Sequence, residues 1–179
     1  MRKNWGLLSL TTLIRLLKSC SIGNSNMRKM FFARNNKQIA NERFETLIDA
    51  IQTHNSEAVK AVFSNNALRE VENIDSSIQE LFGYFQGNLL SYKAWAGPNV
   101  SAKKDNGNYW KSYDCTYDFE TTQDKYRLAM EIITVDTADA DNVGIRSLYI
   151  IRFEDDTDQN CAYWGDGEHT PGINIGKTE

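Results

Sequence analysis

The hydrophobic pattern of this chain changes its period near Gly87 and Asn88, and this change limits the folds available to it. Before this point, apolar residues recur at spacings of three and four, which is typical of amphipathic helices. After it, apolar and polar residues alternate, which is typical of strands with one buried face. Helices followed by hairpin-linked strands predict an α+β fold rather than an alternating βαβ order.

Three helices are expected before the change of period. The first covers about residues 36–53. Asn55 is expected to cap a short second helix that ends at residues 64–66, and the third helix begins near Asp75. Their apolar positions are expected to pack on the concave side of a strongly curved antiparallel sheet: Phe44, Leu47, Ile48, Ile51, Val59, Val62, Phe63, Ile78, Leu81, Phe82 and Phe85.

The strands are expected to form hairpins, because turn-forming residues separate the alternating segments. Residues 105–108 (DNGN) are a strong hairpin signal. Residues 161–176 are expected to add a short strand or to cover the sheet. In the strand at 109–121, the odd-numbered aromatic residues should face the core and the even-numbered polar residues should face water. The predicted strands are residues 89–95, 100–104, 109–121, 126–135 and 143–153.

The first 20 residues resemble a degraded signal of bacterial lipoproteins. The segment has a basic start followed by a mostly apolar stretch. Leu17 and Ser19 precede Cys20 at the positions where such signals carry an apolar and a small residue. The resemblance implies lipidation of Cys20 and anchoring at the outer face of the cell membrane, through the lipid alone.

Two residues depart from that signal and keep an alternative open. Arg15 interrupts the apolar stretch, at a cost of a few kcal/mol for membrane insertion, and Lys18 is unusual so close to the cysteine. The alternative is an amphipathic helix lying on the domain. A cytoplasmic protein is expected if the signal does not function or if translation starts at Met27 or Met30. Residues 21–36 are interpreted as a polar and basic tether, and residues 37–179 as a single domain.

The charge of the main domain argues against nucleic-acid binding. The chain has a formal net charge of -4, and from Asp105 onward it holds 6 basic and 16 acidic residues. Nucleic-acid binders need clustered positive charge to neutralise phosphates. We therefore expect no nucleic-acid partner.

The order of three helices and a curved sheet resembles the nuclear transport factor 2-like (cystatin-like) superfamily. Short segments also resemble a family of uncharacterised lipoproteins from Gram-positive bacteria, a domain of unknown function. They are residues 42–44 (ERF), 76–82 (SSIQELF), 164–167 (WGDG) and 171–173 (PGI). The resemblance covers about residues 38–176. It implies a cone-shaped cavity between the helices and the sheet, and it supplies no catalytic motif.

No catalytic residue is assigned from the sequence. An isomerase or dehydratase of this fold needs a general base and an oxyanion donor, for which Asp114 or Glu131 with Tyr113 or Tyr117 are the candidates. Adjacent strand residues face opposite sides, so Asp114 and Tyr113 cannot converge. Glu131 has the same parity as Lys125 and Arg127 and is interpreted as part of a solvated face.

The sequence also predicts no metal site and no cofactor. It holds two histidines, His54 and His169, which are interpreted as a turn residue and an exposed loop residue. No zinc-site spacing is present. Residues 136–142 fail the calcium-loop pattern, and residues 154–158 are interpreted as a solvated acidic loop. Cys115 is expected to be buried, and whether it pairs with Cys161 stays open.

We therefore predict a non-catalytic, envelope-anchored binding domain. Its ligand would be a small molecule in the cone cavity or a protein partner on the sheet, and a homodimer is possible. The alternatives are an enzyme of isomerase or dehydratase type and a structural or immunity-type interaction domain. Aromatic side chains suit binding sites because they join an apolar body to a polar tip. The residues expected to line the site are Trp95, Tyr113, Tyr117 and Trp164.

The anchor hypothesis makes a direct prediction. Replacing Cys20 with serine removes the thiol that would be lipidated, so Cys20→Ser should move the protein from the membrane fraction to the soluble fraction. Immunoblotting of fractionated cells measures this. A variant that fractionates like the wild type would contradict the anchor.

Overall fold

The computed structural model describes residues 25–160, 162–165 and 167–176. The chain divides into one unit of residues 1–35 and a second of residues 36–179, next to the boundary expected between tether and domain. The predictions for the signal and for Cys20 and Cys161 lie outside the described residues.

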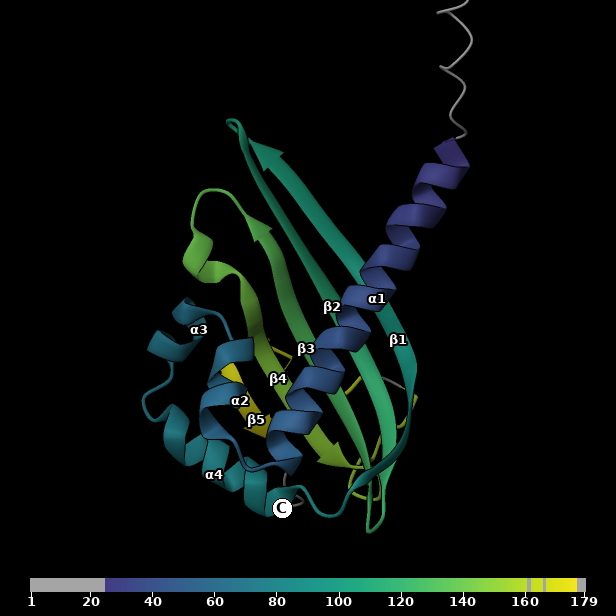
Figure 1. The fold of residues 1–179 in the computed structure, drawn as a ribbon, viewed down its shortest axis with the longest axis vertical. Helices are drawn as coiled ribbons and strands as arrows, with labels where there is room; N and C mark the ends of the chain where they lie inside the picture. Colours follow the sequence, from purple (N-terminus) through teal and green to yellow (C-terminus); the bar gives the residue numbers. More distant parts are fainter. Residues whose placement is uncertain (1–24, 161, 166, 177–179) are drawn as a thin grey trace, which may run out of the picture. The chain divides into compact units, whose positions relative to one another are not determined.

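The second unit has the α+β order that the sequence predicts (Figure 1). Its five-stranded sheet has the order β1-β2-β3-β4-β5, antiparallel except for the parallel pair β4–β5. The sheet is open, with β1 and β5 at its edges. The elements are α1 (Ser25–Gln52), α2 (Ser56–Val62), α3 (Asn65–Glu70), α4 (Ile74–Tyr84), β1 (Leu89–Asp105), β2 (Asn108–Thr121), β3 (Lys125–Asp136), the short 3-10 helix η1 (Ala140–Asn142), β4 (Gly144–Arg152) and β5 (Gly172–Ile175).

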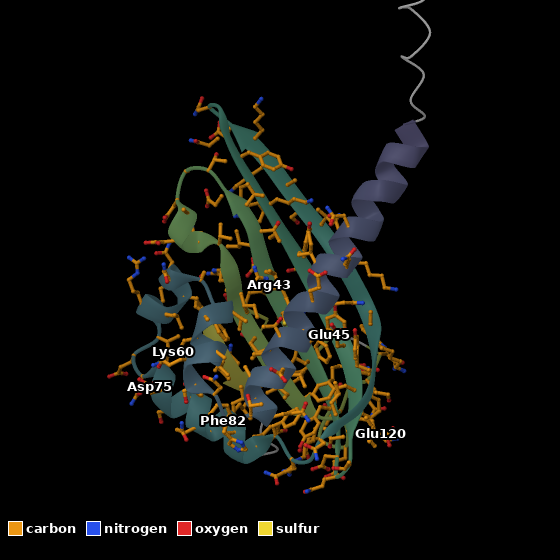
Figure 2. The ribbon with its side chains drawn as sticks, viewed as in Figure 1. Arg43, Glu45, Lys60, Asp75, Phe82 and Glu120 are labelled. Atoms are coloured by element: carbon orange, nitrogen blue, oxygen red, sulfur yellow. The ribbon has the colours of Figure 1, made fainter. Side chains whose placement is uncertain are left out.

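Side-chain caps set the starts of the short helices. Asn55 accepts a hydrogen bond from the Ala58 backbone amide, as predicted. Ser64 was expected to end a helix, but it caps α3 instead, which the sequence analysis missed. Asn73, rather than Asp75, caps α4. Asp75 lies in the first turn of α4, where it pairs with Lys60 of α2 at 2.8 Å (Figure 2).

Two boundaries differ from the prediction. Helix α1 begins at Ser25, so part of the segment interpreted as a tether is helical. The two predicted strands at 89–95 and 100–104 are one strand, β1, which bulges around Gly97 and Pro98. A proline is tolerated there because β1 is an edge strand. Gly97 has φ 86°, and a Cβ at this position would lie 2.3 Å from the Asp114 carbonyl oxygen, so only glycine fits.

Aromatic side chains fill much of the space between the helices and the sheet. The Phe44 ring from α1 lies 4.4 Å from the Tyr117 ring and 4.7 Å from the Tyr92 ring, centroid to centroid. Cys115 is buried beside them, as predicted. Burial raises the pKa of its thiol to about 12, which keeps it protonated and unreactive.

The second face of the sheet, which was expected to be wet, is buried at its centre. Ser112, Thr116 and Asp118 are each less than a tenth exposed. The described part of the segment between β4 and β5 folds over this face, where Trp164 packs against Tyr149 of β4. The alternating pattern of β2 is therefore polar on a face that the protein itself covers.

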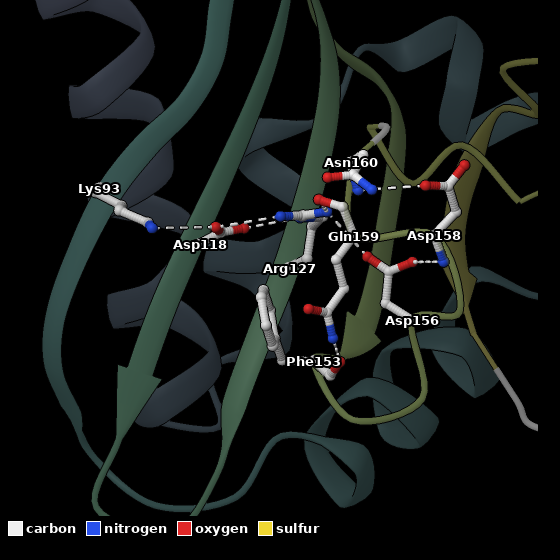
Figure 3. Close-up of polar contacts among 8 residues, drawn as sticks. All are labelled: Lys93, Asp118, Arg127, Phe153, Asp156, Asp158, Gln159 and Asn160. Carbon is white, nitrogen blue, oxygen red and sulfur yellow. Dashed lines mark hydrogen bonds and ion pairs between the residues drawn. The ribbon is translucent and has the colours of Figure 1, made fainter.

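Arg127 of β3 fastens this covering segment (Figure 3). Its side chain is 1 % exposed. It donates to both carboxylate oxygens of Asp118 at 2.7 and 3.2 Å. From the covering segment, Asp156 accepts at 3.0 Å and the Gln159 carbonyl oxygen at 2.8 Å. The guanidinium carbon also lies 4.5 Å from the centre of the Trp95 ring.

Arg127 was expected to be solvated, and its burial predicts a large effect on stability. Arg127→Ala removes the buried cation that lies between two buried carboxylates, Asp118 and Asp156, which should cost about 3–5 kcal/mol of unfolding free energy. Arg69→Ala is the matched control, because Arg69 pairs with Asp141 at the surface and its loss should cost less than about 1 kcal/mol. Urea unfolding measures both, and equal costs would contradict the fastening role.

Candidate functional site

The structure does not gather the four predicted lining residues in one pocket. Tyr113 and Tyr117 lie on the helix-facing side and are each 1 % exposed. Their hydroxyls donate to Asn36 and Asn41 of α1 at 2.7 and 2.9 Å, and burial raises the pKa of Tyr117. These tyrosines therefore join α1 to the sheet.

The two tryptophans lie on the opposite face of the sheet. Trp95 packs on the Arg127 guanidinium. Trp164 stacks on His169 with the ring centres 4.0 Å apart. Both side chains are partly exposed, and both take part in fastening or ordering the covering segment.

A pocket of about 400 Å³ lies between α1 and the β3–β4 region. Its volume is within the range typical of small-molecule sites. Figure 2 shows Arg43 on the side of α1 that looks toward these strands. The lining residues of α1 are spaced by three and four, so they form one stripe of the helix. The lining is Ile39, Glu42, Arg43, Thr46, Ile132, Ile133, Thr134 and Val143.

Arg43 gives this pocket a defined chemistry. Its side chain is partly buried, and no residue in the described part of the chain forms a hydrogen bond or ion pair with it. Glu42 accepts a hydrogen bond from Gln38 at 2.8 Å. A guanidinium beside isoleucine side chains suits a molecule that joins an apolar body to a carboxylate. The sequence did not predict this pocket, because its residues on α1 form a stripe next to the buried apolar stripe by which the helix was recognised.

A second hollow, of about 360 Å³, is less suited to a charged ligand. It is lined mainly by the ends of β1, β2 and β3. Lys93 lies 3.6 Å from Asp118, and Lys125 lies 3.6 Å from Glu120. Because its cations already have carboxylate partners, the pocket at Arg43 is the stronger candidate.

Three side chains with metal-ligating atoms meet on the second face of the sheet. Asp114 of β2 pairs in register with Glu131 of β3. His169 comes from the covering segment. One ligand atom from each residue lies within 4.8 Å of the others, and His169 Nδ1 is 3.7 Å from Glu131 Oε2.

The surroundings of this cluster hold it in place. Arg146 Nη1 donates to Glu131 at 3.2 Å and to the His169 carbonyl oxygen at 3.1 Å. Burial and, to a smaller extent, repulsion by Glu131 raise the pKa of the Asp114 carboxyl above its ordinary value, while His169 acts in the opposite direction.

Two sequence interpretations need correction at this cluster. Glu131 was assigned to a solvated face, but its side chain is 14 % exposed. His169 was interpreted as an exposed loop residue, but it is 32 % exposed and stacked. The suggested pairing of these carboxylates with Tyr113 or Tyr117 is also excluded, because the tyrosines point to the other face of the sheet.

The fold defines a class, namely an α+β domain whose helices cover one face of a mostly antiparallel sheet. A family model described as a domain of unknown function (DUF5104) matches residues 46–153. The chain belongs to this family. No curated protein matches the chain.

The tyrosine contacts can be tested by a double-mutant cycle. Tyr117→Phe should cost about 1 kcal/mol, because it removes the hydrogen bond to Asn41. Asn41→Ala should cost a similar amount, and the double variant should cost less than the sum. Urea unfolding measures all three. Fully additive costs would show that the Tyr117 hydroxyl does not stabilise the domain through Asn41.

Proposed function

We propose that this protein is a non-catalytic binding domain that holds a small molecule in the pocket between α1 and the β3–β4 region. The partly buried Arg43 beside an apolar lining carries the proposal. The order of helices before the sheet supports membership of the nuclear transport factor 2-like superfamily, with its ligand cavity between these layers and a cone-like curvature of the sheet.

The proposed place of action is the outer face of the cell membrane, through a lipid on Cys20. The signal-like composition of residues 1–20 supports this proposal. In the part of the chain that the structure describes, no helix is both long and apolar enough to cross a membrane.

The pocket favours binding over catalysis. Its ionisable side chains are Glu42 and Arg43. Glu42 is exposed and engaged by Gln38, so it lacks the buried setting that tunes a general base. A protein partner on the second face of the sheet has less support than a small ligand, because the covering segment already buries the centre of that face.

Native mass spectrometry of the full chain, purified gently from its original host, tests this function. We expect the wild type to retain a small-molecule mass. Thr46→Trp should reduce the fraction of the protein that retains this ligand by at least about tenfold, because a bulky indole would fill the pocket.

Asp49→Trp is the matched control. It adds the same side chain to an exposed position of α1 outside the pocket lining, so it should retain the ligand as the wild type does. A wild-type protein that retains no small molecule would argue against small-molecule binding in this pocket. The same conclusion would follow if Thr46→Trp retained as much ligand as the wild type.

A further inference from the structure

We propose that Asp114, Glu131 and His169 bind a divalent transition-metal ion on the second face of the sheet. This site is separate from the ligand pocket at Arg43, and neither proposal depends on the other. Three independent features carry it: the convergence of the ligands, the charge they leave uncompensated, and the way His169 is held.

The ligands converge from segments that are far apart in the sequence. Asp114 and Glu131 lie opposite each other on paired strands, so the strand register sets their spacing. Their ligand atoms and that of His169 lie within 4.8 Å of one another. Ligands about 2.0–2.2 Å from a zinc ion are themselves roughly 3–3.5 Å apart. The observed separations, 3.7 Å between His169 Nδ1 and Glu131 Oε2 and up to 4.8 Å within the cluster, exceed this value by an amount that side-chain rotations can close.

The two carboxylates carry more negative charge than their neighbours neutralise. Glu131 pairs with Arg146. In the described chain, by contrast, no residue donates a hydrogen bond to the Asp114 carboxylate or forms an ion pair with it, although this side chain is partly buried. Asp118 is the other carboxylate of β2 on this covered face, and it pairs with Arg127. A cation at Asp114 would supply the missing partner.

His169 is positioned as a ligand by contacts that do not use its ring nitrogens. Its carbonyl oxygen accepts hydrogen bonds from Arg146 and from the Ser147 hydroxyl. Its ring stacks on Trp164 with an angle of 12° between the planes. Nδ1 already lies 3.7 Å from Glu131 Oε2 in this arrangement, so the ring offers a nitrogen to the carboxylates while these contacts are kept.

The ligand types select the class of ion. Calcium and magnesium prefer oxygen ligands alone. One imidazole with two carboxylates suits zinc or manganese, and three protein ligands leave positions open for water.

Isothermal titration of the metal-depleted full chain with zinc chloride tests the proposal. We expect one tight equivalent of zinc in the wild type. His169→Gln and Asp114→Asn should each weaken binding by at least about tenfold. His54→Gln is the matched control, because His54 is the other histidine of the chain and is exposed. It should bind zinc as the wild type does. Absence of zinc binding by the wild type, or unchanged binding by His169→Gln, would overturn the site.

A measurement on the wild type alone covers the case in which a variant fails to fold. Diethyl pyrocarbonate modifies accessible histidine nitrogens, and peptide mapping follows each histidine separately. Zinc should slow the modification of His169 several-fold and leave His54 unchanged. Equal rates at His169 with and without zinc would refute the proposed coordination.

Discussion

The second half of the domain depends on the hydrogen bonds and ion pairs that the buried guanidinium of Arg127 forms. Burial of a charge is costly unless it is paired and hydrogen-bonded. Here Asp118 supplies a bidentate partner from the neighbouring strand, and Asp156 and Gln159 supply partners from the covering segment. The same contacts that satisfy the arginine therefore bring the covering segment onto the sheet. The position of His169 beside Asp114 and Glu131 follows from that covering.

Much of the fold could be predicted because its signals are local. The Asn55 cap, the hairpin turn at residues 105–108 and the alternation in β2 each depend on neighbouring residues. Errors arose where two elements share a signal. Ser64 follows one helix and caps the next. Gly97 and Pro98 resemble a strand end, yet an edge strand accommodates them as a bulge.

The sites were harder to predict because they depend on contacts between distant segments. A strand face with Lys125, Arg127 and Glu131 has the same sequence pattern whether water or another segment covers it. The spacing of Asp114, Glu131 and His169 matches no compact motif, since strand register and the returning chain bring them together. Aromatic content drew attention to Tyr113 and Tyr117, whose hydroxyls hold α1 against the sheet. The sequence gives no local sign that Arg43 borders a pocket.

The parallel pairing of β5 with β4 has a consequence for the order in which the domain is completed. Parallel neighbours need a long crossover connection, and here that connection is the segment that covers the sheet. Strand β5 is made after every other element. During synthesis, the polar face around Arg127 must remain hydrated at least until the chain has passed Gln159, a residue of the covering segment that Arg127 contacts. A face composed of serine, threonine, aspartate and arginine can stay exposed to water during this time. An apolar face in the same place would promote association between incompletely synthesised chains.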